Sequence, residues 1–251
     1  MSQLVLSLFP GIGLLDIAFE ETGFCVVRGP DVLWGGDIRR FHPTAGRFDG
    51  IIGGPPCQCF SQLAYIVRAN GHQTKFGNLI PEFERVCLEA SPKWWLMENV
   101  PRAPRPIVDG YAAWSTILNN RQLGEAQNRV RRFTFGVRGT KYRVLPIDVV
   151  VFENQQYESA ATGGHSGTLS RVDRRRVGKP GSIQEYRKGT SCLGENYKTN
   201  WAFKELKRKQ GLPEDFDIPP FTVAAKCKAV GNGVPLAMGR AIAKAVLEVT
   251  E

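Results

Sequence analysis

Over the first 140 residues, short apolar runs alternate with stretches of helical periodicity. The apolar runs predict buried strands near residues 4–8, 25–27, 50–52, 94–97 and 133–137. Between Leu79 and Ala90, apolar positions recur at helical spacing, and Pro81 falls in the first turn, where a helix tolerates proline. This alternation predicts an α/β fold with a mostly parallel sheet and helices on both faces.

The pattern changes near residue 141. From there to about residue 200, glycine, serine, threonine, arginine and asparagine are frequent and helical periodicity is weak, which predicts an irregular second domain. Helical spacing returns between Met238 and Val246, so a closing helix could dock on the first domain. We expect a catalytic and cofactor-binding domain at 1–140, a small domain at 141–222 and a returning segment at 223–251.

Composition excludes several classes of protein. The chain has 251 residues, 42% of them apolar, which suffices for a real core. It lacks an apolar run of about 18 residues that could span a membrane, and it begins without the basic segment of a signal peptide, so we expect the cytosol. Six cysteines without a CxxC pair, and isolated histidines, predict free thiols and no structural zinc.

The net charge of +9 is unevenly distributed. Residues 141–210 hold 14 Lys/Arg and 7 Asp/Glu, so most of the excess lies in about a quarter of the chain. A basic segment of this kind indicates a polyanionic partner. A solvated basic surface is the alternative.

A ligand-binding turn is predicted at residues 9–13, whose sequence is Phe-Pro-Gly-Ile-Gly, between a strand and a helix. Glycines allow a tight turn, and a helix N-terminus offers free N–H groups. Asp31 and Asp37 follow later, and a carboxylate at a strand end can accept ribose hydroxyls, so together they favour an adenosine-type ligand. A plain structural turn and ordinary turn aspartates remain alternatives. Asp16 replaces the third glycine of the dinucleotide fingerprint, which disfavours a dinucleotide.

A cysteine lies in a loop of restricted path directly after the third strand. Residues 53–61 read Gly-Gly-Pro-Pro-Cys-Gln-Cys-Phe-Ser. Such a loop can place one side chain at the carboxyl edge of a sheet, so Cys57 is a candidate nucleophile. Cys59 would face away in an extended loop. A buried apolar role is the alternative for Cys57 and the expectation for Cys25, Cys87, Cys192 and Cys227.

The cysteine loop resembles the catalytic Pro-Cys-Gln motif of the C5 cytosine-specific DNA methyltransferases. Further motifs of that family are matched, in order, at residues 9–13, 23–31, 35–38, 78–79, 98–100, 127–133, 210–216 and 231–235. The resemblance implies a Rossmann-like, S-adenosylmethionine-dependent mixed sheet with a small irregular target-recognition domain. Only residues 32–36 separate Asp31 from Asp37 of the next motif, where the family usually has a helix, so a trimmed face beside the adenine pocket is implied.

The resemblance also implies a reaction: methyl transfer from S-adenosylmethionine to C5 of a flipped cytosine in double-stranded DNA, through a bond from Cys57 to C6. Glu98 would be the general acid, with a turn or helix cap as the alternative. Arg129 and Arg131 alternate along a predicted strand and would share one face. Arg129 would hold the base carbonyl or Glu98, and Arg131 would brace the cysteine loop. Arg132 would point away and form a surface ion pair.

The remaining expectations concern binding residues and partners. Expected cofactor contacts are Phe9, Gly11, Ile12, Gly13, Leu14, Asp31, Asp37, Ile38, Pro55, Leu79, Asn232 and Val234. Expected nucleic-acid contacts are Gln58, Ser61, Thr168, Arg171, Arg174, Arg175, Arg176 and Lys179. We expect S-adenosylhomocysteine as product, no metal, and a monomer in the cytoplasm of a bacterial or virus-infected bacterial cell. Alternatives are a tRNA cytosine-5 methyltransferase of the same family, a catalytically silent DNA-binding homologue and a small-molecule methyltransferase.

Overall fold

The computed structural model describes residues 2–57, 60, 77–150, 157–161 and 200–251. The chain forms two units: Met1–Leu118 with Val130–Ile147 and Ile242–Glu251, and Asn119–Arg129 with Asp148–Ala241. The domain boundaries expected from the motifs, after residues 140 and 222, stay a prediction. Among the described helices, none is long and apolar enough to cross a membrane.

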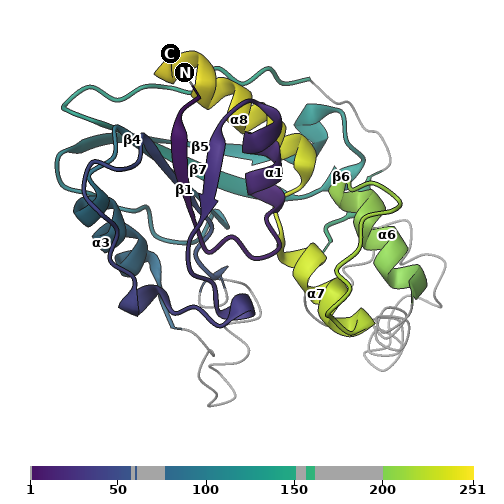
Figure 1. Cartoon of the computed structure of the whole chain (residues 1–251). Coiled ribbons are helices and arrows are strands. Elements are labelled where there is room, and N and C mark those ends of the chain that lie inside the picture. The colour runs from purple at the N-terminus through teal and green to yellow at the C-terminus, as the bar shows by residue number, and fades with distance from the viewer. Residues whose placement is uncertain (1, 58–59, 61–76, 151–156, 162–199) are drawn as a thin grey trace. The chain divides into compact units, whose positions relative to one another are not determined.

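The first unit contains a six-stranded sheet in the order β2-β1-β3-β4-β7-β5 (Figure 1). Its elements are β1 (Leu4–Leu8), α1 (Leu14–Glu21), β2 (Cys25–Arg28), β3 (Gly50–Gly53), α3 (Ile80–Ala90), β4 (Trp94–Asn99), β5 (Tyr111–Asn119) and β7 (Val130–Arg138). Strands β1 to β4 run parallel to one another, whereas β7 runs antiparallel to β4. The mixed α/β sheet is therefore confirmed.

Two adjacent tryptophans on β4 show how helices cover both faces of this sheet. Neighbouring side chains on a strand point to opposite faces. The ring of Trp94 stacks on Phe19 of α1, with centroids 6.3 Å apart. The ring of Trp95 meets Phe83 of α3 edge-on, with centroids 5.9 Å apart. Helices α1 and α3 thus bury opposite faces, each through a large aromatic contact.

Glycines on the neighbouring strands make room for both indoles. Gly50 lies opposite Trp94, and Gly136 lies opposite Trp95. A Cβ added at either glycine would lie 2.2 Å from the facing indole ring. Overpacking of this kind typically costs about 1–3 kcal/mol. The glycines therefore fix β3 and β7 against the central strand.

The parallel strands end at a common edge, which places the loops expected to carry chemistry side by side. Leu8 is opposite Gly53, and Gly53 is opposite Met97. The turn after β1, the cysteine loop after β3 and the end of β4 therefore leave the sheet as neighbours. Ligands of open α/β sheets bind at this carboxyl edge.

The second unit contains a two-stranded sheet of β6 (Gln127–Asn128) and β8 (Glu158–Ser159). Its helices are α6 (Asn200–Gln210), α7 (Val223–Asn232) and the first turns of α8 (Leu236–Thr250). The remaining turns of α8 belong to the first unit, where Gln3 Nε2 donates a 2.8 Å hydrogen bond to Thr250 Oγ1.

Candidate active site

The turn after β1 adopts the left-handed backbone that its glycines favour. Gly11 has φ 57°, and Phe9, which is not a glycine, has φ 56°. A non-glycine residue in this region costs roughly 1–2 kcal/mol and is typical of functional sites. A Cβ added at Gly11 would meet no atom within 4 Å, so the described residues leave open space beside this turn. A ligand can therefore approach the backbone closely here.

Asp31 ties this turn to the 3-10 helix η1 (Val32–Trp34). Its Oδ2 accepts from Gly11 N at 2.9 Å, and its Oδ1 accepts from Leu33 N at 2.7 Å. Because each carboxylate oxygen can accept two hydrogen bonds, both oxygens retain capacity for a pair of hydroxyls. Trp34, which the sequence analysis did not single out, donates from Nε1 to Gly11 O at 2.7 Å.

The buried carboxyl of Asp16, on the helix that follows the turn, stabilises this turn. Asp16 is fully buried; Ser7 Oγ donates to its Oδ1 at 2.5 Å, and Arg28 Nε donates to its Oδ2 at 3.0 Å. Burial raises the pKa of Asp16 despite these two partners. Gly13 has φ 79°, and a Cβ there would lie 2.6 Å from an Arg28 nitrogen. Asp16, which stands where the dinucleotide fingerprint has its third glycine, therefore stabilises the turn through buried hydrogen bonds.

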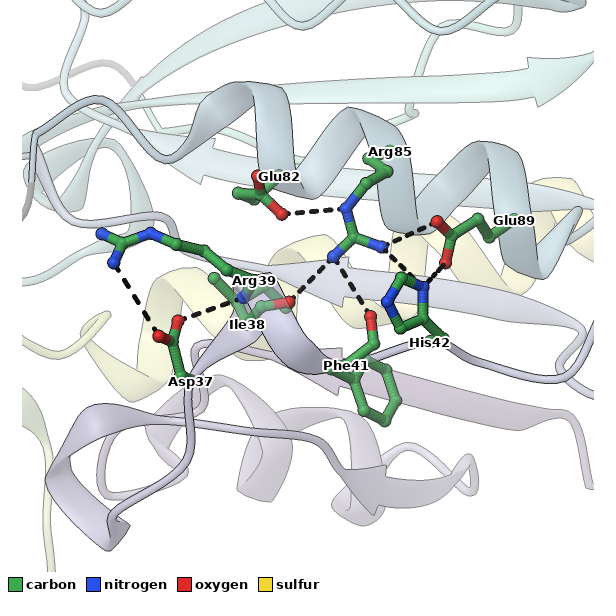
Figure 2. A network of polar contacts seen from close by, with 8 residues as sticks. All are labelled: Asp37, Ile38, Arg39, Phe41, His42, Glu82, Arg85 and Glu89. Carbon is green, nitrogen blue, oxygen red and sulfur yellow. Dashed lines mark hydrogen bonds and ion pairs between the residues drawn. The ribbon is translucent and has the colours of Figure 1, made fainter.

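The segment expected to contact adenine is anchored by a helix of the first unit. Arg85 of α3 donates from Nη2 to Ile38 O at 2.8 Å and to Phe41 O at 3.1 Å (Figure 2). The same guanidinium pairs with Glu82 at 2.9 Å and with Glu89 at 2.8 Å. The hydrogen bond from Arg85 is the main cause of a lowered pKa of Glu89. Arg85 thus fixes the backbone of this segment.

The expected cofactor contacts in this region differ in exposure. Asp37 is partly exposed and caps the 3-10 helix η2 (Ile38–Arg40), accepting from Arg39 N at 3.1 Å. Ile38 and Leu79 are 3% and 6% exposed and belong to one hydrophobic cluster. Leu14, the first residue of α1, is also buried. Leu14, Ile38 and Leu79 are therefore buried core side chains beside the more exposed Asp37.

The cysteine loop is bonded to both neighbouring strand ends. Gly54 N donates to Leu8 O at 3.3 Å, and Asn99 Nδ2 donates to Pro55 O at 3.1 Å. Cys57 is partly exposed. A thiol in this position is not sealed within the core and lies on the loop next to the turn after β1.

Glu98 lies between this loop and β7. Its Oε1 is 2.8 Å from Nε of Arg131, and the two side chains are 13% and 17% exposed. Its Oε2 would be 3.3 Å from a Cβ added at Gly54. The carboxyl therefore faces the cysteine loop with one oxygen and Arg131 with the other.

One of the two roles expected for Arg129, holding the carboxyl of Glu98, is wrong. Arg129 lies between β6 and β7, where its N–H donates to Gln127 O at 3.0 Å, so it does not continue the alternation that includes Arg131. Its buried guanidinium donates to four carbonyls, those of Ala161, Gly231, Asn232 and Gly233. A cation is favourable at a helix C-terminus, and Arg129 caps the end of α7. Arg131, not Arg129, holds Glu98.

The surface ion pair expected for Arg132 is also wrong. Arg132 is 7% exposed and donates to the carbonyls of Pro101, Ala103 and Pro104. Because these carbonyls belong to the loop after β4, Arg132 organises that loop.

Other expected residues lie in the second unit or outside the described residues. Asn232 ends α7, and Val234 is 7% exposed. Gln210 Nε2 supports this segment by donating to Val230 O at 2.7 Å and to Gly233 O at 2.9 Å. Outside the described residues lie Gln58, Cys59, Ser61, Thr168, Arg171, Arg174, Arg175, Arg176, Lys179 and Cys192.

Sequence comparison supplies the family. The model of the family described as C-5 cytosine-specific DNA methylase matches residues 33–106. The type II methyltransferase M.FnuDI of Fusobacterium nucleatum is 26% identical over 97% of this chain and 94% of its own length. The chain belongs to the C-5 cytosine-specific DNA methylases. M.NgoPII of Neisseria gonorrhoeae is 30% identical to this methylase over 53% of the chain and 48% of its own length.

A solved structure shows the same fold. A DNMT2 mutant of Spodoptera frugiperda has a TM-score of 0.64 to this methylase, with 16% identity over 99% of both chains. The Rossmann-like architecture expected from the resemblance is therefore confirmed.

Arg85 and Trp34 are the site-supporting residues of this methylase that sequence reasoning missed. Glu82 and Glu89 lie three residues before and four residues after Arg85, a spacing that brings helical side chains together. That charge pattern could have indicated an anchored guanidinium. The hydrogen bond from Trp34 to Gly11 had no sequence signal beyond its nearness to Asp31.

Proposed function

We propose that the chain transfers a methyl group from S-adenosylmethionine to C5 of cytosine in double-stranded DNA. The observation that carries this proposal is Glu98, which is held by Arg131 and faces the cysteine loop at the common edge of the sheet. A protein that only bound DNA would need neither a partly exposed thiol at Cys57 nor a carboxyl positioned beside its loop.

The residues around the turn fit the proposed cofactor. S-adenosylmethionine, when bound, supplies an electrophilic methyl group on a sulfonium. The open space beside Gly11 admits a ligand, and the free acceptor capacity of Asp31 suits a ribose diol. Asp37 and the anchored η2 segment would bind the adenine end. Asn232 and Val234 are proposed to contribute from the second unit.

The proposed chemistry begins at the sulfur of Cys57. As a thiolate it adds to C6 of cytosine, and the electron pair of the C5–C6 bond moves toward C5 and the ring nitrogen N3. Glu98 offers a proton or hydrogen bond at N3, where negative charge accumulates, and Arg131 holds the carboxyl in place. C5 would then bond to the methyl carbon as the bond between that carbon and the sulfonium sulfur breaks; sulfur would keep the electron pair, and S-adenosylhomocysteine would be the leaving group.

The second half of the reaction restores the ring. A base removes the proton from C5, its electron pair re-forms the C5–C6 double bond, and the bond between C6 and Cys57 breaks to release the thiolate. Water can serve as this base. The order of events requires Cys57 to be both a nucleophile and a leaving group, which suits a thiolate.

The substrate carbon is inaccessible inside a duplex, so the cytosine must flip out at a cost of roughly a few kcal/mol. We propose that Arg171, Arg174, Arg175, Arg176 and Lys179 offset this cost through phosphate contacts, with Thr168 in the same recognition segment. Gln58 and Ser61 would contact the nucleic acid from the cysteine loop.

The test is transfer of labelled methyl groups from S-adenosylmethionine to duplex DNA and, in a parallel arm, to tRNA. We expect label in DNA, with bisulfite sequencing placing it on cytosine C5, and no label with Cys57→Ala. Label in tRNA alone would overturn the proposed substrate. Binding of DNA without any transfer would support a silent homologue instead.

A further inference from the structure

The loop that follows β4 leaves the sheet directly after Glu98 and Asn99. It contains three prolines, at positions 101, 104 and 106, which restrict its backbone. Ala103 is 3% exposed and Pro106 is buried, whereas Arg102 and Arg105 are exposed. The loop therefore has an inward apolar side and presents two arginines to solvent.

Buried contacts hold this loop in place. The guanidinium of Arg132, on β7, donates to Pro101 O at 2.9 Å, to Pro104 O at 2.8 Å and to Ala103 O. On the other side, Ile107 N donates to Glu84 Oε1 of α3 at 2.8 Å. The two arginines thus project from a backbone that hydrogen bonds hold in place. Less conformational entropy is therefore lost when they bind a ligand.

The arginines at this loop have no ion-pair partner within the described part of the chain. No acidic side chain described there forms an ion pair with Arg102, Arg105 or Arg132. Burial lowers the pKa of Arg132, and the positive charge of Arg105 lowers it further. The acceptor oxygen of Glu84 is bonded to the backbone of Ile107, and Asp109 is exposed at the end of the loop. Arg102 and Arg105 are therefore exposed on one short loop without a carboxylate partner among the described residues, which favours an external anion.

We propose that Arg102 and Arg105 bind backbone phosphates of the DNA strand next to the flipped cytosine. Guanidinium groups bind phosphate oxygens in a bidentate manner, and most contacts in such interfaces go to the backbone. The loop begins one residue after Asn99, whose amide bonds the cysteine loop, so a strand that delivers its base to Cys57 passes this edge. The inference rests on the proposed function and adds DNA contacts from the first unit to those proposed for residues 171–179.

The test compares Arg102→Gln/Arg105→Gln with the wild-type chain in DNA binding at several salt concentrations. Each phosphate contact contributes about 0.9 to the slope of log affinity against log salt. We expect the double variant to bind duplex DNA roughly tenfold more weakly, with a slope reduced by about 1–2. S-adenosylmethionine binding should be unchanged, which also verifies folding.

Two controls make the result specific. Arg47→Gln/Lys141→Gln removes two exposed charges near the opposite edge of the sheet and should leave the slope close to wild type. Arg102→Lys/Arg105→Lys keeps the charge and should restore most of the slope. An unchanged slope in Arg102→Gln/Arg105→Gln, with active wild-type enzyme, would overturn this inference alone. Wild-type chain that neither binds nor methylates DNA would overturn the proposed function and this surface with it.

Discussion

The Nε atom of Arg131 lies 2.8 Å from Oε1 of Glu98, and both side chains are largely buried. Glu98 is on β4, and Arg131 comes from β7, the antiparallel neighbour of that strand. The carboxyl proposed to act on the base is therefore oriented by a strand that follows it by some thirty residues in the chain. Its second oxygen remains directed at the cysteine loop.

This pair predicts a selective loss of activity. Arg131→Met should lower kcat about 100-fold, because Glu98 loses the partner that orients it. The affinity for S-adenosylmethionine should change little, since the cofactor turn is held by Asp31 and Asp16. Arg138→Met, at the other end of the same strand, should keep near wild-type kcat. Steady-state kinetics with duplex DNA measure both, and equal kcat for Arg131→Met and wild type would refute the positioning role.

Arg129 should behave differently, because its guanidinium serves the backbone. Arg129→Met removes the guanidinium from the carbonyls at the end of α7, where Gln210 still donates to Gly233 O, and should lower the free energy of unfolding by about 2–4 kcal/mol. Arg129→Lys should recover only part of this loss, since one ammonium cannot span these carbonyls. Urea unfolding provides the measurement. Wild-type stability in Arg129→Met, combined with lost catalysis, would favour direct contact with the base.

Arg85 should affect the cofactor more than the chemical step. Arg85→Met releases the carbonyls of Ile38 and Phe41 and should raise the Kd for S-adenosylmethionine roughly tenfold, equivalent to about 1.4 kcal/mol. The value of kcat at saturating cofactor should change by less than about threefold. Arg47→Met serves as the control at an exposed site. Calorimetric titration showing an unaltered Kd would contradict the anchoring role.

The buried carboxyl of Asp16 predicts a pH dependence of stability. Its pKa is raised above 3.8 by burial, so the folded state holds the proton more tightly than the unfolded state. The stability it contributes is therefore greatest below pH 3.8 and declines as pH rises through the folded-state pKa. Asp16→Asn lacks this titration, so its stability relative to wild type should increase as pH rises above 3.8. Urea midpoints at several pH values measure the difference, and a gap that stayed constant or shrank would argue against it.

The central strands could be predicted because they are buried on both faces. Continuous apolar runs at β1, β3 and β4 have few other structural solutions, and α3 follows its helical spacing from residue 80 to 90. By contrast, β5 is an edge strand with mostly partly exposed or exposed positions, and α6 is polar apart from one buried face, so neither was predicted. The hydrophobic pattern therefore predicts the buried central elements more readily than the exposed peripheral ones.

The residues of the candidate site could also be predicted only in part. Local spacing and resemblance located Cys57, Glu98 and Arg131, which the structure brings to one edge of the sheet. The roles of Arg129 and Arg132 depended on long-range contacts with carbonyls, which carry no side-chain signature in the sequence. Arg129 also lies outside β7, between that strand and β6. The alternation of side chains along one strand, from which a shared face with Arg131 was inferred, therefore does not extend to Arg129.

The covalent role proposed for Cys57 can be tested with a mechanism-based trap. A duplex with 5-fluorocytosine at the target position carries fluorine where the C5 proton would be removed, so release of the thiolate is blocked after methyl transfer. With S-adenosylmethionine present, peptide mass spectrometry should find a stable adduct of chain and DNA at Cys57, and the matched cytosine duplex should give none. An adduct at Cys59, or methylated DNA from an enzyme that never forms an adduct, would rule out Cys57 as the covalent nucleophile.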